Sequence, residues 1–176
     1  MSAVESRPYR WPYHGRVMPA QTVLMVFRDG PAEEGQVLGN LARVAEVARS
    51  AGVRLAHSQP AGEAPLLPVA AGDLVVERPR YGAFNGTDLD MVLRAAGLTD
   101  LLIAGVPLEL GADCTMREAN DLGYECLLIE DCCTGLSEET FHGAVSSIQM
   151  SGGIFGAVAT ASEVMAALSA VSGGQP

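Results

Sequence analysis

The stretch Leu101–Tyr124, LLIAGVPLELGADCTMREANDLGY, contains a predicted strand, a turn and a predicted helix. Its first six residues, through Val106, form an apolar run typical of a parallel strand buried on both faces. Pro107 ends this strand because proline has no N–H to donate to a β-ladder. A helix is expected from Gly111 to Gly123, where glycine is typical of a helix end. Because ligands of open α/β sheets bind beyond the carboxyl ends of the strands, the turn before Gly111 is the expected functional site.

The rest of the chain alternates between short apolar segments and segments with helical periodicity. Strands are also predicted at 22–27, 53–57, 73–77, 125–130 and 155–159, and helices at 34–52, 87–96, 137–150 and 162–171. This alternation indicates an α/β fold of three layers, α/β/α, with a six-stranded parallel sheet of the Rossmann type. We expect a single domain at 21–172, preceded by an arm at 1–20 that is rich in proline and aromatic residues.

The composition limits the class of function. The net charge of −10 argues against nucleic acid as a partner. No apolar run reaches the roughly 18 residues that a membrane span requires, and the first residues lack the apolar segment of a signal peptide, so a cytoplasmic protein is expected. All 11 basic residues are arginine. The four cysteines have no zinc-site spacing, so we expect free thiols, no metal and no cofactor.

Residues 105–126 carry a resemblance to a known family. They resemble the nucleophile motif of the isochorismatase-like cysteine hydrolases, most closely the branch of biuret hydrolase and N-carbamoylsarcosine amidohydrolase. The family pattern is GVTTDVCVxxTMREANDxGYEC, and this chain reads GVPLELGADCTMREANDLGYEC. The flanks agree, but Gly111 stands where the family carries its catalytic cysteine. The resemblance extends from about Pro8 to Leu168, and it implies the isochorismatase-like fold and a homodimer or homotetramer.

The resemblance also locates the other two members of the family's catalytic triad. The family's general-base aspartate aligns with Arg28, and its lysine aligns with Arg78. In the family the aspartate takes the thiol proton, the lysine stabilises the ionised pair, and the thiolate attacks an amide carbonyl. Glycine at position 111 cannot be a nucleophile, and arginine cannot act as a base near neutral pH. Thiol amidohydrolase chemistry by the family route is therefore not expected.

Several alternatives stay open for the lost roles. A shift of one residue would make Asp29 the base, although the period of two in a strand would turn that side chain away. Cys114, one helical turn after Gly111, is a conceivable relocated nucleophile, but a structural thiol is the favoured interpretation. Isochorismatases proper, which cleave a vinyl ether, also carry glycine at this position. They keep the aspartate and the lysine that Arg28 and Arg78 replace here. The site could also be inactive.

Arg28 and Arg78 are predicted to point into one pocket. Two like charges about 6 Å apart repel by roughly 3 kcal/mol at an effective dielectric of 20. Such a pair requires an anion, which is either an internal carboxylate (Asp29, Glu109 or Asp113) or a carboxylate of a ligand. The planar guanidinium group suits a ligand carboxylate because it can donate two parallel hydrogen bonds.

The leading functional hypothesis is a repurposed small-molecule enzyme. It would act on a polar, carboxylate-bearing substrate by acid–base or electrostatic chemistry, such as isomerisation, cyclisation, elimination or a hydrolysis without a thiol. Arg28 and Arg78 would bind and polarise the substrate, and Glu109 or Asp29 would move protons. Further lining residues are predicted at Trp11, Tyr81, Pro107 and Leu108, and the bond between Val106 and Pro107 is predicted to be cis. The alternative is a catalytically inactive binding or scaffold subunit.

Overall fold

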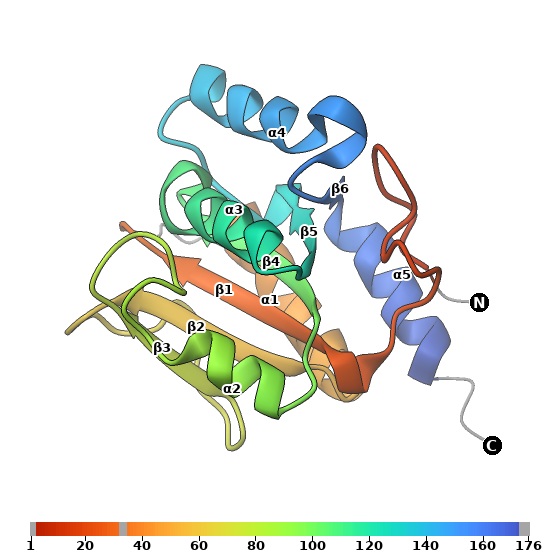
Figure 1. The fold of residues 1–176 in the computed structure, drawn as a ribbon, viewed down its shortest axis with the longest axis horizontal. Helices are drawn as coiled ribbons and strands as arrows, with labels where there is room; N and C mark the ends of the chain where they lie inside the picture. The colour runs from red at the N-terminus through yellow and green to blue at the C-terminus, as the bar shows by residue number, and fades with distance from the viewer. Residues whose placement is uncertain (1–2, 32–34, 173–176) are drawn as a thin grey trace.

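The computed structural model describes residues 3–31 and 35–172 (Figure 1). Its strands are β1 (Thr22–Arg28), β2 (Arg54–Pro60), β3 (Leu74–Arg78), β4 (Asp100–Val106), β5 (Glu125–Ile129) and β6 (Ala157–Ala159). They form one sheet in the order β3-β2-β1-β4-β5-β6, and every pair is parallel. The predicted α/β fold with six parallel strands is confirmed.

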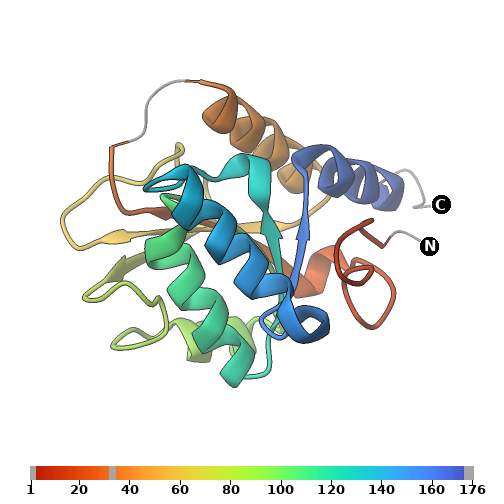
Figure 2. The same cartoon turned by 90° about the horizontal axis from the view of Figure 1, so that it is seen from above.

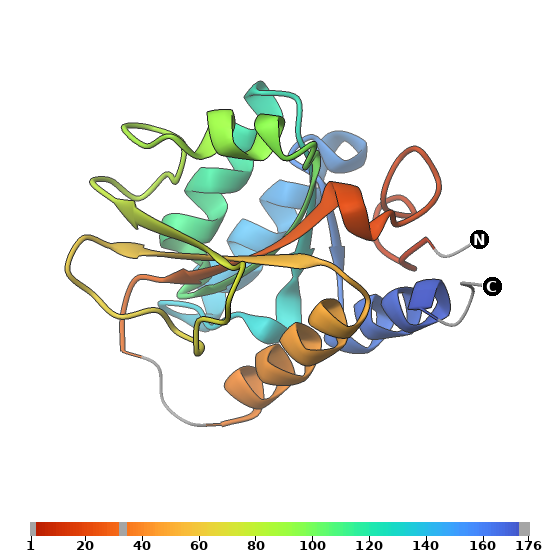
Figure 3. The ribbon, with the colours of Figure 1, turned by 90° about the horizontal axis from the view of Figure 1, so that it is seen from below.

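Five α-helices cover the two faces of the sheet. They are α1 (Gln36–Ser50), α2 (Leu89–Ala95), α3 (Asp113–Asp121), α4 (Glu138–Gly153) and α5 (Ala161–Ser172). Helices α1 and α5 lie together on one face, whereas α2, α3 and α4 lie on the other, which gives the three predicted layers (Figure 3). Helices α3 and α4 run side by side, joined by a hydrogen bond of 2.9 Å from Arg117 to Ser147 (Figure 2).

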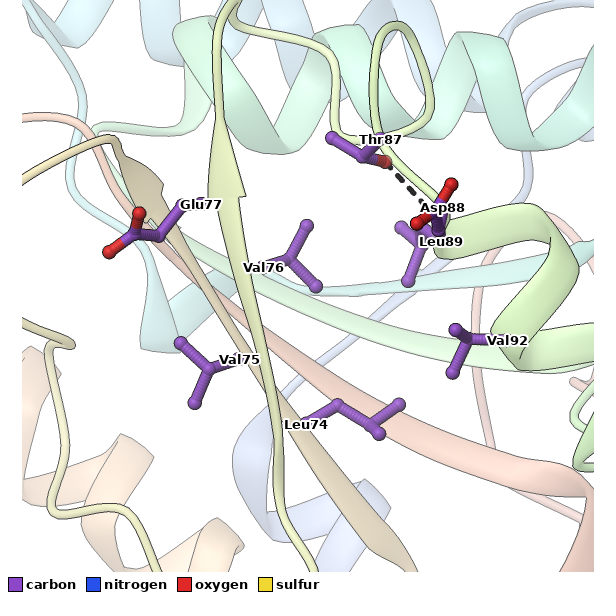
Figure 4. A pocket seen from close by; sticks show the side chains of 8 residues that line it. All are labelled: Leu74, Val75, Val76, Glu77, Thr87, Asp88, Leu89 and Val92. Carbon is purple, nitrogen blue, oxygen red and sulfur yellow. Dashed lines mark hydrogen bonds between the residues drawn. The ribbon is translucent and has the colours of Figure 1, made fainter.

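The sheet assigns each side chain at its carboxyl edge to one face. Phe27 of β1 pairs with Ser58 of β2, which pairs with Val76 of β3, and paired residues of neighbouring strands point to the same side. Figure 4 shows that Val76 points towards α2, whereas Val75 points away from it. The period of two therefore puts Asp29, Pro60 and Arg78, two residues further along each strand, on the face covered by α2.

The central strands form the core because they are apolar on both sides. All seven residues of β4 are buried, and so are the first six of β1. Strand β2 continues to Pro60, three residues beyond its predicted end, and the helix predicted from Gly111 begins as α3 only at Asp113. A five-residue turn, Leu108–Ala112, precedes it.

The amino-terminal arm packs on the β6 side of the sheet. Arg7 forms an antiparallel bridge with Val158 of β6, and Trp11 bridges to Val4 and is fully buried. The backbone N–H of Tyr13 donates to Glu125, at the beginning of β5 and hence at the amino edge of the sheet. The prediction that Trp11 lines the pocket is therefore wrong, because its side chain is fully buried and does not belong to the lining of the cleft beside Arg78 that is described below.

Within the described part of the chain, no helix combines the length and the apolar character that a membrane crossing needs.

The start of α4 provides a test of helix capping. Ser137 is the N-cap, and its side chain accepts a hydrogen bond of 3.1 Å from the backbone N–H of Thr140. Replacing Ser137 with alanine should lower the free energy of unfolding by about 1 kcal/mol, because that donor loses its partner. Urea denaturation measures the change. Ser146→Ala, within the same helix and without a side-chain hydrogen bond to another described residue, is the control, and an equal loss in both variants would contradict the capping role.

Candidate active site

The turn after β4 carries Gly111 to the carboxyl edge of the sheet. The Val106–Pro107 peptide bond is cis, as predicted. The backbone N–H of Leu108 donates to the carbonyl of Thr134 over 2.8 Å, and both Pro107 and Leu108 are buried. These two residues support the turn but do not line the cleft described below, so the prediction that they contact a ligand is not borne out.

A buried ion pair lies at the centre of this edge. Arg78 Nη2 and Asp29 Oδ1 are 2.8 Å apart, and both side chains are 1% exposed. Asp29 Oδ2 accepts a hydrogen bond of 3.0 Å from the backbone N–H of Gly111. Arg78 also donates to backbone carbonyls, over 2.6 Å to Tyr81 and 3.2 Å to Arg28. These contacts therefore bring three chain segments together, which are the end of β1, the end of β3 and the turn after β4.

Arg28 does not take part in this cluster through its side chain. Its Nη1 donates to the carbonyl of Ala64 over 2.9 Å, and its Nε lies 3.7 Å from Glu63. The reason is the alternation of β1, which sends Phe27 and Asp29 to the α2 face and Arg28 to the other. The prediction of a pocket with Arg28 and Arg78 side by side is wrong. The alternative alignment, shifted by one residue, is the one that agrees with the structure, because Asp29 rather than Arg28 lies beside Arg78.

The volume of a nucleophile's side chain at Gly111 is already filled. A Cβ atom added there would lie 2.8 Å from Arg78 Nη1 and closer still to Asp29 Oδ2. Neither group can retreat easily, since each is buried and holds the other. The site therefore accommodates glycine, and a cysteine would displace the ion pair.

An open cleft of about 320 Å³ adjoins the ion pair. Its lining residues are Asp29, Pro60, Arg78, Pro79, Arg80 and Tyr81. Tyr81, which the sequence predicts as a lining residue of the pocket, is 55% exposed and lies in the lining of this cleft. Arg80 was not predicted, although it stands next to Tyr81 in the sequence, two residues after Arg78. The only hydrogen bond that its side chain makes to the described residues is one of 3.2 Å to the carbonyl of its neighbour, Pro79.

Glu109 points away from the cleft. Its carboxylate accepts hydrogen bonds from the backbone N–H of Leu136 at 3.0 Å and from Thr140 Oγ1 at 2.6 Å. Both donors belong to the segment that begins α4, so Glu109 fastens that helix to the turn. The predicted role of Glu109 in moving protons beside Arg78 is therefore wrong.

Asp113 and Cys114 do not supply the missing groups. Asp113 forms an ion pair of 3.0 Å with Arg117, one helical turn later, and is thus not the counter-ion of Arg78. Burial raises the pKa of the Cys114 thiol, and the negative charges of Asp113 and Glu118 raise it further. A thiol with a raised pKa is a poor nucleophile near neutral pH, because the thiolate is the reactive form.

The remaining thiols are structural. Cys126, Cys132 and Cys133 are free and buried, as predicted, and burial raises the pKa of Cys133 to about 12. Across residues 3–31 and 35–172, His, Cys, Asp and Glu side chains form no group of three or more that could hold a metal ion.

A second hollow of about 340 Å³ lies between β3 and α2 (Figure 4). Leu74, Val76, Leu89 and Val92 give it a mainly apolar lining. The hydroxyl of Thr87 accepts a hydrogen bond of 3.2 Å from the backbone N–H of Leu89, which is the dashed line in the figure. The groove has no buried charge pair, so the cleft beside Arg78 is the better candidate for chemistry.

Comparison with known proteins identifies several relatives of this chain. Residues 20–163 match the model of the isochorismatase domain. The chain is 39% identical over 84 residues to the isochorismatase family protein YwoC of Bacillus subtilis, covering 48% of this chain and 44% of the relative. It is 32% identical over 88 residues to the ureidoacrylate amidohydrolase RutB of Azorhizobium caulinodans, covering 44% and 39%. These matches span less than half the length of either relative.

The fold is also that of solved structures. The crystal structure of a cysteine hydrolase from Pseudomonas syringae pv. phaseolicola superposes with a TM-score of 0.78 at 18% identity. The superposition covers 97% of this chain and 99% of that protein, so the two share their architecture from end to end.

The glycine at position 111 gives a stability test of the site. Gly111→Ala should lower the free energy of unfolding by about 1–3 kcal/mol, because the new methyl group overlaps the Asp29–Arg78 pair. Thermal and urea denaturation measure this loss. Gly143→Ala in α4, where an added Cβ meets nothing within 4 Å, should instead be neutral or stabilising. A stable Gly111→Ala protein would contradict the filled site.

The thiol of Cys114 gives a test of reactivity. Because its pKa is raised, a smaller fraction is thiolate at pH 8 than in a free cysteine, whose pKa is about 8.5. Alkylation of the folded protein by iodoacetamide, followed by mass spectrometry from pH 6 to 10, should be slower than that of a free thiol and half-maximal above about pH 8.5. Cys114→Ala identifies the labelled residue, and a midpoint below pH 8 would reveal an activated thiol.

Proposed function

Because the chain belongs to the isochorismatase family, we propose that it is a small-molecule enzyme of that family that works without a thiol nucleophile. The observation that carries the proposal is the Asp29–Arg78 pair, 2.8 Å apart and held under the Gly111 turn. Asp29 is the acid–base group in this proposal, since it is the acidic residue of the cleft lining. Arg78 keeps that carboxylate oriented and balances its charge.

The route of the named hydrolase relatives does not suit this site. A cysteine hydrolase attacks with a thiolate, and here the equivalent position is a glycine whose side-chain volume is occupied. A glycine beside a retained aspartate and a cation is instead the combination that the resemblance assigns to isochorismatases proper. We therefore favour proton transfer by Asp29 without a covalent intermediate, in a hydrolysis, elimination, isomerisation or cyclisation.

Arginine at position 78 changes the family's cation in a way that fits this chemistry. Its fork contacts Asp29 and three backbone carbonyls, those of Arg28, Arg80 and Tyr81. A lysine ammonium offers three donors and could not hold all four acceptors at once. Arg78 is thus a positioning residue for Asp29, and it cannot exchange the proton itself.

Two further properties belong to the proposal. The substrate is a small polar anion, because the cleft lining holds two arginines and one aspartate. The active form is a homodimer or homotetramer, as the resemblance of residues 105–126 implies, and sedimentation velocity tests it.

An inactive scaffold is the second candidate. It is favoured by the ion pair that fills the space beside Gly111, because the charges of Asp29 and Arg78 neutralise one another and both side chains are 1% exposed. An inactive protein would bind ligands in the cleft or a partner elsewhere but convert none. The two candidates differ in turnover alone.

The test is a turnover screen with matched variants. Small carboxylic acids, their enol ethers, esters and amides are incubated with the protein, and consumption is followed by mass spectrometry. Turnover by the wild type should persist in Cys114→Ala and fall at least a thousandfold in Asp29→Asn, since the amide cannot take up a proton.

The folding of the variants must be controlled. Removing one member of a buried ion pair costs about 3–5 kcal/mol, so Asp29→Asn is compared with Asp29→Asn/Arg78→Gln, which removes both charges. Both variants are checked by circular dichroism before assay. A covalent adduct on any cysteine during turnover, or full activity in a folded Asp29→Asn protein, would refute the proposed chemistry. No turnover by the wild type would favour the scaffold.

A further inference from the structure

Resting on the proposed function, we propose that Arg80 is the specificity-determining residue of the cleft and that it selects a planar monoanion. Arg78 cannot perform this task through its terminal nitrogens, because Asp29 and backbone carbonyls already occupy them. Arg28 cannot perform it either, because its side chain lies on the opposite face with Glu63. The cation that is left in the lining is Arg80.

Arg80 has no carboxylate partner within the described residues. The only hydrogen bond that its side chain makes there is to the carbonyl of Pro79, which leaves most of its five N–H donors for a ligand. The side chain is exposed at the open side of the cleft. A ligand carboxylate that reaches it can accept two parallel hydrogen bonds from the guanidinium group.

The charge of the cleft differs in sign from that of the molecule. The whole chain carries −10, whereas the cleft lining holds Arg78 and Arg80 against Asp29. Since Arg78 and Asp29 neutralise one another, the remaining local charge is that of Arg80. An anion repelled by most of the surface is therefore attracted here, and one negative charge matches the one free cation.

A second donor without a partner belongs to Arg78, which is also in the cleft lining. The Nε of Arg78 is buried and has no hydrogen-bond partner in the described residues. Leaving a buried charged donor unpaired is unfavourable, so an acceptor oxygen of a bound ligand would stabilise it. A bound ligand that offers one oxygen to this Nε and a carboxylate to Arg80 would contact both arginines.

The other residues of the cleft lining constrain the shape and polarity of the uncharged part of the ligand. Pro60, Pro79 and the half-exposed ring of Tyr81 give flat apolar surfaces on which a planar group can stack. The volume of about 320 Å³ is at the lower end of the range of small-molecule sites. The class that fits is a small unsaturated or aromatic carboxylate with one negative charge.

Benzoate and benzamide test this inference, because they have nearly the same shape and differ in charge. Isothermal titration of the wild type should give at least tenfold tighter binding of benzoate, and the preference should weaken as the salt concentration rises. Arg80→Gln should abolish the preference. Arg54→Gln, which removes an exposed arginine at the beginning of β2 and thus at the opposite edge of the sheet, should retain it.

A separate measurement tests the contact between a ligand oxygen and the Nε of Arg78. Benzoate should shift the side-chain Nε–H resonance of Arg78 in ¹⁵N-correlated spectra, with the resonance assigned by its loss in Arg78→Lys. An unchanged resonance at saturating benzoate would overturn this contact.

The outcomes separate the inference from the proposed function. Equal binding of the two probes, or a benzoate preference that survives in Arg80→Gln, would overturn the role of Arg80 whatever the activity of Asp29→Asn. Loss of the preference in Arg80→Gln together with full turnover in Asp29→Asn would instead leave the anion site standing and refute the chemistry assigned to Asp29.

Discussion

The buried ion pair between Asp29 and Arg78 is the interaction on which the site depends. It joins the ends of β1 and β3, which are separated in the sheet by β2, and Asp29 also holds the turn after β4 through Gly111. Because both charges are 1% exposed, neither can turn to water when the other is lost. The ion pair therefore fixes the relative positions of three chain segments at the edge where ligands of such sheets bind.

The identities of positions 78 and 111 are physically coupled through this pair. A guanidinium group is broader than an ammonium group, and here it makes contacts with Asp29 and three carbonyls at once. The space it fills, together with the carboxylate, is the space that a Cβ at Gly111 would enter. Glycine at position 111 and arginine at position 78 are thus two parts of one packing arrangement. A side chain introduced at position 111 alone would overlap the ion pair.

The architecture could be predicted from the sequence, but the directions of the side chains at the carboxyl edge of the sheet could not. Alternating apolar and helical segments predicted all six strands, and the resemblance of residues 105–126 predicted the family. The end of β1 was assigned incorrectly because Thr22–Phe27 is buried on both faces, and such a strand shows no polar alternation from which to tell whether Arg28 or Asp29 faces the site. The sequence also does not predict the direction of the Glu109 side chain. The turn Leu108–Ala112 is irregular, with Leu110 at φ −97° and ψ −107°, and in it the Glu109 side chain points towards α4.

The two arginines of the segment Arg78–Tyr81 differ in burial and in the number of donors that are free. The buried Arg78 has its terminal nitrogens saturated by the protein and orients a carboxylate, whereas the exposed Arg80 retains its donors. An arginine keeps its charge throughout the pH range in which proteins stay folded, and the chain contains no lysine. No cation of the cleft can therefore serve as a proton source, and Asp29 is the one carboxylate residue of the cleft lining. Acid–base chemistry in the cleft therefore has three possible carriers of the proton, which are that carboxylate, the hydroxyl of Tyr81 and the substrate itself.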